Sequence, residues 1–415
     1  MGFQIPDHRN PHPTGNIKHV SLLSSYQTEP FTRPASAEEE TLYDVAVIGG
    51  GLAGLTLSIQ LAQLGWTVVL LEKEKYPFHR VCGEYISMES WDFLERLGYP
   101  LSNLELPRIK KLVVSAPGGN SVSHPLPLGG FGISRYKIDS GLARLAVQSG
   151  VQLKEETTVR GVHLKQSYFS VECSGAQYRA KVVCGSFGKR SNLDIKWKRP
   201  FAEQKPAKLN NWIGVKYHVR TRFVPDTIAL HNFENGYCGL SRIEEDKYCL
   251  CYLTTAANLG RSGHSISRME EEILYRNPFL KEIFQQSEFL YRSPLTISQI
   301  SFQKKSQVEQ GVLLLGDAAG LITPLCGNGM SMGLHAGKLA AELIDRFLQK
   351  KLSREQLEQQ YIQEWNRRFA RRLQAGRLIQ RLFGKEWMTD AFIRVVKPFP
   401  SFISYLIRQT HGEPF

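Results

Sequence analysis

The sequence predicts an α/β protein in which a parallel-sheet domain is interrupted by a second, β-rich domain and followed by C-terminal helices. Three observations lead to this prediction. A glycine-rich loop at residues 49–54 follows an apolar strand and opens a helix. Alternating segments, typical of strands, fill residues 210–300. An apolar strand and a second glycine-rich loop then appear at residues 312–330, directly before another helix.

The composition is that of a globular protein, with 415 residues of which 42% are hydrophobic and 22% charged. No run of 18 apolar residues predicts a membrane span, and the first residues lack the apolar core of a signal peptide. The seven cysteines form no C-x-x-C pair and no cluster with histidine. We therefore expect a cytoplasmic, reduced protein without a metal site.

The positive charge is concentrated near the C-terminus. The net charge is +13, and residues 351–415 contain twelve Lys and Arg against six Asp and Glu. Such a tail can attract nucleic acid, an anionic membrane surface or an anionic ligand. The chain shows no nucleic-acid-binding motif, so we expect no nucleic-acid partner.

The first unit of the parallel sheet begins at Tyr43. Residues 43–51, YDVAVIGGG, are typical of a buried strand that ends in glycines, and residues 52–65 form a mainly apolar helix ending at Gly65. Residues 66–74, WTVVLLEKE, form a second buried strand ending at Glu72. This strand–loop–helix–strand order is Rossmann-like.

The glycine loop GGGLAG matches the pattern G-x-G-x-x-G. Gly49 permits the tight turn, Gly51 lets a pyrophosphate approach the backbone, and Gly54 lets the helix pack against the strand. The free N–H groups and dipole of the helix favour phosphate, and a carboxylate at Glu72 can accept both hydroxyls of a ribose. The predicted dinucleotide site therefore includes Gly49, Gly51, Leu52, Ala53, Gly54 and Glu72.

Three motifs carry a resemblance to a known family: GGGLAG with Glu72, RVCGEYIS at residues 80–87, and GDAAGLITPLCGNGM at residues 316–330. Their layout resembles the FAD-binding fold of the aromatic-hydroxylase type, in particular the flavoproteins that include geranylgeranyl reductases and related dehydrogenases and monooxygenases. The resemblance implies FAD as a non-covalent cofactor. It also implies an FAD-binding domain at residues 41–105, 132–190 and 301–350 and a substrate-domain sheet at 106–131 and 191–300. Outside the resemblance, residues 1–40 are rich in Pro, Ser, Thr and His and lack periodicity, which predicts a mobile arm, and residues 351–415 are predicted to be a helical region.

The resemblance also implies roles for residues of the later motifs. Arg80 would reach the adenosine or pyrophosphate, and Asp317 would bond a ribityl hydroxyl. Cys82, Gly83 and Glu84 would lie nearer the isoalloxazine ring, with Cys82 either a redox thiol or a small residue that fills the loop. Arg135 would lie near FAD, or form a helix-end salt bridge. The remaining residues of the predicted FAD site are Lys73, Gly83, Gly316, Pro324, Gly327, Asn328, Gly329 and Met330, of which the last four would face the pyrimidine edge of the ring.

The electron donor is left open by residues 182–191, VVCGSFGKRS. Aromatic hydroxylases often carry an acid here that serves both FAD and NAD(P)H, and Phe187 stands in its place. Lys189 and Arg190 could still attract an anionic donor, or could be solvated basic residues. The sequence therefore leaves open whether NAD(P)H is the electron donor.

The substrate is expected to be a small molecule bound by the second sheet. Gly239 and Ser241 stand where geranylgeranyl reductases carry an aromatic residue and proline, and the Trp-x-Trp stretch of flavin halogenases is absent. Aromatic and polar residues of the sheet could line a pocket or simply pack, and either histidine among them could act as an acid or base. These candidates are Trp212, Tyr217, His218, His231 and Tyr237.

The C-terminal region combines apolar and basic residues. Residues 364–382 carry an apolar stripe with arginines beside it, and the tail from Trp387 to Ile407 adds aromatic residues with Arg394 and Lys397. Such helices can lie on an anionic membrane or pack on the body of the protein. We keep peripheral membrane contact as an expectation.

We predict an FAD-dependent oxidoreductase, with a monooxygenase of secondary metabolism that hydroxylates an aromatic or polyketide-like compound as the leading interpretation. No protein nucleophile is needed for that chemistry, and no catalytic side chain is predicted. One alternative is a reductase or dehydrogenase acting on a prenyl or other unsaturated lipid. Another is a catalytically silent flavin-binding protein.

Overall fold

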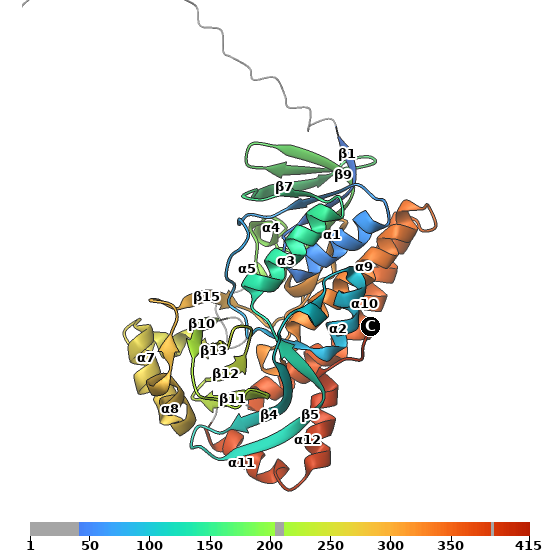
Figure 1. Ribbon diagram of the computed structural model, residues 1–415. Helices are drawn as coiled ribbons and strands as arrows, with labels where there is room; N and C mark the ends of the chain where they lie inside the picture. The colour runs from blue at the N-terminus through green and yellow to red at the C-terminus, as the bar shows by residue number, and fades with distance from the viewer. Residues whose placement is uncertain (1–40, 204–210, 383–385) are drawn as a thin grey trace, which may run out of the picture. The chain divides into compact units, whose positions relative to one another are not determined.

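The computed structural model describes residues 41–203, 211–382 and 386–415 (Figure 1). The arm predicted at residues 1–40 lies outside the described residues. Two β-sheets, flanking helices and a C-terminal helical region make up the described chain, which confirms the predicted α/β fold class.

The first sheet has a parallel core of the predicted Rossmann-like kind. Strand β1 pairs in parallel with β2 on one side and with β9 on the other, and β17 pairs in parallel with β9. Its strands lie in the order β16 (Val308–Glu309), β17 (Val312–Leu314), β9 (Gln177–Gly185), β1 (Leu42–Ile48), β2 (Val68–Leu71) and β6 (Gln152–Lys154), and β7 (Val159–Leu164) and β8 (Phe169–Cys173) extend it beside β9.

Apolar side chains fill the strands of this sheet because helices cover them. Val45, Val47 and Leu70 have no solvent exposure, as expected for a parallel sheet that is buried on both faces. Helix α1 packs on two helices that come from distant parts of the sequence. These helices are α1 (Leu52–Gln63), α3 (Arg135–Gln148) and α9 (Gly329–Leu348).

The second sheet is largely antiparallel and draws strands from separate parts of the chain. Its order is β14 (Glu288–Phe289), β10 (Trp212–Arg220), β13 (Tyr248–Thr255), β12 (Gly236–Arg242), β11 (Thr227–Phe233), β4 (Arg108–Ser115), β5 (Ser121–Gly132) and β3 (Tyr85–Ser87), with β15 (Leu295–Ile300) beside β10. Strands β11 and β4 pair in parallel, which joins residues 108–132 to the later strands.

The two faces of the second sheet have different neighbours. Tyr217 and Leu250 point to the face covered by helices α7 (Ile266–Glu272) and α8 (Pro278–Gln286), which lie on one side of the strands in Figure 1. Because side chains alternate along a strand, Lys216 and His218 point to the opposite face. The shorter helices are α2 (Trp91–Leu97), α4 (Asn192–Lys196), α5 (Pro200–Glu203) and α6 (Ala256–Arg261).

The C-terminal region consists of helices α10 (Arg354–Leu382), α11 (Glu386–Val396) and α12 (Pro400–Thr410). Helix α10 packs on α9, and its Tyr361 donates a hydrogen bond of 2.6 Å to the carbonyl of Leu314 in the first sheet. None of the helices in the described parts of the chain combines the length and the apolar character needed to cross a membrane.

Candidate functional site

The first glycine loop, residues 49–54, is shaped by contacts that exclude side chains. Gly49 has a φ of +99°, and a Cβ there would lie 2.6 Å from the carbonyl oxygen of Ser186. A Cβ at Gly54 would lie 2.2 Å from the carbonyl oxygen of Gly49. Both approaches are far below van der Waals contact, so only glycine fits. The loop therefore brings α1 tightly against β1 and β9.

The N-terminus of α1 offers donors to an anion. Gly51 precedes the helix, and no side chain caps the helix there, so its first N–H groups lack a partner of that kind. A Cβ at Gly51 would lie 3.7 Å from a guanidinium nitrogen of Arg135. Backbone donors, the helix dipole and an arginine thus converge on one point, as a diphosphate requires.

Two predicted arginines are held at this loop by one carboxylate. Arg135 donates to Asp139 from Nε at 2.8 Å and from Nη2 at 2.7 Å. Arg80 contacts Asp139 at 3.1 Å and Glu72 at 3.2 Å. Asp139 is 1% exposed, and it is not among the residues predicted from the sequence. Its spacing of four residues from Arg135 on one helix is the signal that could have found it.

Glu72 closes the loop from the end of β2. Its Oε2 accepts a hydrogen bond of 2.7 Å from the N–H of Gly50, and its Oε1 accepts one of 3.0 Å from the N–H of Glu74. The expected contact between Glu72 and a ribose stays a prediction. The side chain of Lys73 is 66% exposed and pairs with Glu74 at 3.3 Å, and its expected contact with FAD also stays a prediction.

The second glycine loop, residues 316–330, meets the first at α1. Gly316 has a φ of +56°, and a Cβ there would lie 3.5 Å from the Cβ of Ala53. Burial raises the pKa of the following residue, Asp317, while Lys305 and then Arg135 act to lower it. Lys305 donates a hydrogen bond of 2.8 Å to the backbone carbonyl of Asp317. The half-buried carboxyl group of Asp317 thus lies within the electrostatic influence of Arg135 and Arg80.

The residues around the two loops fit FAD. The tight turn at Gly49 and Gly54, the uncapped N-terminus of α1 and the guanidinium of Arg135 facing Gly51 are the groups that would hold a diphosphate. Arg80 and Arg135 would supply the positive charge, and Asp317 would supply an acceptor for hydroxyl groups farther along the cofactor. When bound, FAD would bring two-electron redox chemistry to this part of the protein.

The later residues of the second glycine loop have different surroundings. Pro324 is exposed and begins a short 3₁₀ turn. Gly327 has a φ of +65°, and a Cβ there would lie 3.1 Å from the ring of Tyr85. Asn328 donates a hydrogen bond of 2.9 Å to the carbonyl of Thr410, so its amide is directed away from the helix. Gly329 begins α9 without a side-chain cap, and Met330 is buried.

The motif RVCGEYIS lies on the second sheet. The Sγ of Cys249 contacts the carbonyl oxygen of Cys82 at 3.2 Å, and Ser241 donates a hydrogen bond of 3.2 Å to the carbonyl of Gly83. Burial raises the pKa of the Cys82 thiol, which favours the unreactive form of the sulfur. This chemistry supports the interpretation of Cys82 as a packing residue.

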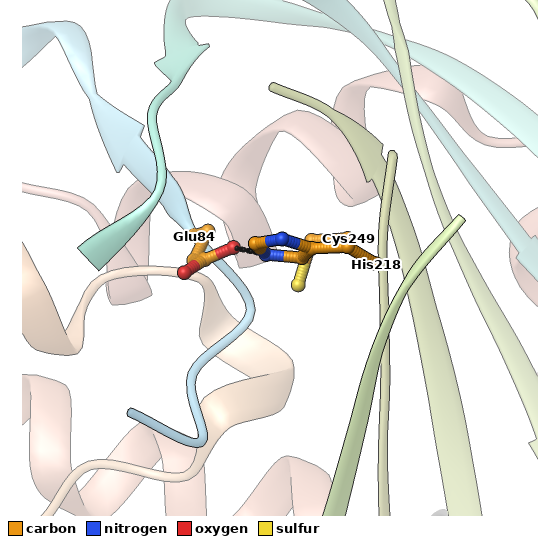
Figure 2. A group of neighbouring side chains, drawn as sticks. All are labelled: Glu84, His218 and Cys249. Atoms are coloured by element: carbon orange, nitrogen blue, oxygen red, sulfur yellow. Dashed lines mark hydrogen bonds and ion pairs between the residues drawn. The ribbon is translucent and has the colours of Figure 1, made fainter. Parts of the chain in front are cut away.

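Glu84 is the centre of a buried charged network that the sequence analysis did not predict (Figure 2). Its carboxylate forms an ion pair with Lys216, lies 2.5 Å from Nε2 of His218, and accepts a 2.8 Å hydrogen bond from the N–H of Arg135. Burial acts to raise the pKa of Glu84, but Lys216 and His218 outweigh it and hold the pKa below its ordinary value. Glu84 is therefore a carboxylate at neutral pH.

The register of β10 and β13 explains this network. Lys216 pairs with Cys251 and His218 with Cys249 across the two strands, so all four side chains belong to one face. The alternation of Lys216 and His218 within WIGVKYHV could have shown that they share a face. Their partner could not be found in this way, because Glu84 is more than 130 residues distant in sequence.

The network continues through Tyr291 toward a half-buried histidine. The hydroxyl of Tyr291 lies 2.7 Å from Nδ1 of His218 and 3.2 Å from Nδ1 of His79. Burial, and then the charge of Lys216, lower the pKa of His79 to about 4. A neutral histidine, a hydroxyl and a second histidine thus form an unbroken chain of hydrogen bonds that ends at Glu84.

Glu84, His218 and Cys249 also bring three potential metal ligands within 4.8 Å of one another, and Figure 2 shows them converging. A divalent cation here would face the ammonium group of Lys216, which contacts the same carboxylate. It would also have to displace the hydrogen bond between Glu84 and His218. We therefore interpret the cluster as a hydrogen-bonded network rather than a metal site.

The five candidate pocket residues separate into two groups. Trp212 and Tyr237 lie in an apolar cluster with Leu325 of the second glycine loop, and His218 shares their face of the sheet. Tyr217 instead donates a hydrogen bond of 3.0 Å to Glu270, and His231 stacks on Phe279 at 5.1 Å, both on the helix-covered side. Because side chains alternate along a strand, Tyr217 and His231 face away from Trp212, His218 and Tyr237, and the five residues cannot line one pocket.

The fold and the site define an FAD-binding oxidoreductase with a Rossmann-like domain and a second sheet. The chain matches the model of the family described as FAD binding domain over residues 42–375, and it belongs to that family. This match confirms the family resemblance that the three sequence motifs predicted, and it supports FAD as the cofactor.

Curated relatives carry different names. Conditioned medium factor receptor 1 of Dictyostelium discoideum is 26% identical over 80% of this chain and 69% of its own length. Digeranylgeranylglycerophospholipid reductase 2 of Methanothermobacter thermautotrophicus is 25% identical over 88% of this chain and 98% of its own.

Solved structures show the fold. The flavin-dependent brominase Bmp2 covers 89% of this chain and 93% of its own, with a TM-score of 0.72 and 20% identity. A geranylgeranyl bacteriochlorophyll reductase-like protein of Thermoplasma acidophilum covers 90% of this chain and 96% of its own, with a TM-score of 0.70 and 19% identity.

Proposed function

We propose that the protein is an FAD-dependent reductase that saturates a carbon–carbon double bond in an isoprenoid or other unsaturated lipid. The observation that carries this proposal is a buried apolar cluster, which we call the apolar wall, where the second sheet meets the second glycine loop. Leu230, Tyr237 and Leu253 of the sheet pack there with Phe302 and Leu325. Side chains of this kind recognise a hydrocarbon chain by burial rather than by hydrogen bonds.

The names of the relatives support the same substrate class. The chain is similar over most of its length to digeranylgeranylglycerophospholipid reductase 2, and over 73% of its length to menaquinone reductase of Mycobacterium tuberculosis. Both names describe the reduction of an isoprenoid compound. Together with the apolar wall, they move our preference from the hydroxylation expected from sequence to the reduction of a double bond.

The chemistry assigns separate tasks to the residues of the site. Saturating a double bond requires a hydride, which FAD would supply after reduction by a two-electron donor such as a nicotinamide nucleotide, and a proton for the second carbon. Arg80 and Arg135 would bind the diphosphate, and Asp317 would orient the ribityl chain. The hydrogen-bonded chain from His79 through Tyr291 and His218 to Glu84 would hold and move protons close to the loop at residues 80–84.

The test is an anaerobic reoxidation experiment on the FAD-loaded protein. The flavin is reduced chemically, oxygen is excluded, and a geranylgeranyl lipid or a menaquinone is added while the visible absorbance of oxidised flavin is followed. We expect the absorbance to return and the isoprenoid chain of the product to gain two hydrogen atoms, which fragmentation in the mass spectrometer distinguishes from reduction of a quinone ring to the quinol. Absence of reoxidation by every unsaturated lipid tried would contradict the proposal.

The second candidate is the monooxygenase expected from sequence, and one observation favours it. Trp212 stacks edge-on against Phe302 at 6.2 Å within the same apolar wall, beside Tyr237, and aromatic walls suit an aromatic or polyketide-like substrate. Oxygen uptake that depends on such a substrate, with a hydroxylated product, would identify this activity. If no substrate of either class changes the flavin spectrum, a catalytically silent flavin-binding protein becomes the better interpretation.

A further inference from the structure

Exposed apolar side chains are concentrated in the C-terminal helices. Among the described residues, fifteen large hydrophobic residues are exposed, and six of them lie between residues 378 and 405. A soluble protein exposes single apolar side chains everywhere, but a concentration in one segment indicates a binding surface. These six are Leu378, Trp387, Val395, Phe399, Phe402 and Tyr405, with exposed fractions of 62%, 73%, 65%, 61%, 46% and 55%.

Helices α11 and α12 each have one face packed on the rest of the protein, and the exposed apolar side chains lie on the opposite face. In α12, Ile407 packs on a cluster that includes Leu126 of β5, and Ser404 is hydrogen-bonded to His124 of β5 at 2.8 Å. Phe402 and Tyr405 stack on each other at 6.4 Å on the exposed side. In α11, Ile393 is 1% exposed, whereas residues 387, 391 and 395 follow at intervals of four along an exposed stripe.

The connection between α11 and α12 adds an exposed tip. Residues 397–400, KPFP, are all exposed. Phe399 stands between two prolines, whose rings restrict the backbone. A rigid turn that presents a large aromatic side chain loses little conformational entropy when that side chain is buried by a partner.

The tip and α12 carry only basic charges, whereas α11 also contains Glu386 and Asp390. From residue 391 to residue 410 the chain has three basic residues and no acidic one. Arg394 is paired with Asp390 at 2.8 Å, and Lys397 and Arg408 lie in the tip and in α12. The whole chain carries +13. Apolar aromatic residues among basic ones match the interface of an anionic bilayer, which offers hydrocarbon below a layer of negative headgroups.

We propose that helices α11 and α12, with the tip at residues 397–400, bind the surface of an anionic lipid bilayer. The helices lie in the plane of the interface, with Phe399, Phe402 and Tyr405 among the acyl chains and Lys397 and Arg408 at the headgroups. The proposal does not depend on the reaction. If the substrate is a membrane lipid, this contact also holds the enzyme at the bilayer that contains the substrate.

The test is sedimentation of the full-length, FAD-loaded protein with vesicles. We expect binding to phosphatidylglycerol-containing vesicles, weaker binding to pure phosphatidylcholine, and loss of binding as salt screens the headgroups. Replacing both Phe399 and Phe402 with Ser should weaken binding by about tenfold or more, because each aromatic side chain contributes through its burial. The pair Leu164→Ser and Val224→Ser, at exposed positions elsewhere, is the matched control and should bind like the wild type.

Three results would overturn the proposal. These are no binding to anionic vesicles, equal loss of binding in the control pair, and a surface that instead mediates self-association or capture of a protein partner. Self-association would appear as a concentration-dependent mass in light scattering that the Phe399→Ser and Phe402→Ser pair abolishes. Melting temperature and FAD content of every variant confirm that the body is folded. Activity on a detergent-dispersed substrate separates failure of membrane binding from failure of the proposed reaction.

Discussion

Glu84 and Lys216 form an ion pair in which neither side chain has any solvent exposure. Glu84 belongs to the loop that follows the first half of the Rossmann-like domain, and Lys216 belongs to β10 of the second sheet. The same carboxylate accepts a hydrogen bond from the N–H of Arg135 at the start of α3. One buried pair thus connects the second sheet to the residues predicted to hold the diphosphate.

Removing one partner of this pair should be more harmful than removing both. Lys216→Met leaves the carboxylate of Glu84 without its main counter-charge in a buried position, and breaking such pairs typically costs about 3–5 kcal/mol. The double variant Glu84→Gln with Lys216→Met should lose less stability than Lys216→Met alone, and therefore less than the sum of the two single variants. Urea denaturation of all four proteins in a double-mutant cycle measures the difference.

The exposed pair Lys137–Glu245 serves as the control for this cycle. Its atoms lie 4.0 Å apart and its side chains are 37% and 60% exposed. Lys137→Met should therefore change the free energy of unfolding by less than about 1 kcal/mol. Additive losses in the Glu84–Lys216 cycle would mean that the two charges are not coupled.

Arg135 should contribute to the affinity for FAD. Replacing it with Met removes the guanidinium that faces Gly51, and a lost hydrogen bond to a charged group costs about 1.5–3 kcal/mol, or about ten- to a hundredfold in the dissociation constant. Arg144→Met on the exposed side of the same helix is the control and should leave the affinity unchanged. Titration of the apo-protein with FAD, followed by flavin fluorescence, measures both.

An Arg135→Lys variant separates charge from geometry. Lysine keeps the positive charge but cannot form the two-pronged contact with Asp139, so its affinity should fall between those of the wild type and Arg135→Met. If Arg135→Met binds FAD as tightly as Arg144→Met, the diphosphate lies elsewhere.

Asp317 should hold the ribityl end of the cofactor. Asp317→Ala should weaken the retention of FAD by about tenfold or more, since a hydrogen bond to a charged acceptor is lost. The exposed residue Asp246, whose side chain is 80% accessible, provides the control variant Asp246→Ala. Equilibrium dialysis gives the dissociation constants, and an unchanged value for Asp317→Ala would remove the residue from the site.

Stability should decrease as the pH falls from 7 to 5. Burial lowers the pKa of His231 to about 4 and that of His335 to about 3, whereas an unfolded histidine titrates near 6.5. Between these values the unfolded chain binds protons that the folded chain does not, so acid favours unfolding. The melting temperature should fall over this range, and His231→Asn should reduce the slope. An unchanged slope would show that His231 is protonated in the folded state.

Local patterns predicted the parts of the site that depend on neighbouring residues. Gly54 is needed because the carbonyl oxygen of Gly49, five residues earlier, approaches it, so the glycine spacing predicts the loop, although the atom that excludes a side chain at Gly49 belongs to the distant Ser186. Arg80, Arg135 and Asp317 could be named one by one through the resemblance. Asp139, which binds both arginines, was missed, although its position on the helix of Arg135 follows from helical periodicity.

Contacts between distant segments could not be predicted in this way. Strand alternation shows that Lys216 and His218 share a face, but the sequence does not say which loop covers that face. The same limitation placed Tyr217 and His231 among the pocket candidates, since their side of the sheet is settled only by the position of α7 and α8.

The sequence by itself therefore determined the α/β class, the Rossmann-like start and the two glycine loops, because periodicity and glycine spacing are properties of adjacent residues. The tertiary structure alone decided three relationships. Both loops meet at α1, the negative charge of Glu84 is balanced by the positive charge of Lys216, and one face of the C-terminal helices stays uncovered. These relationships depend on how separate segments pack, and packing is a property of the whole chain.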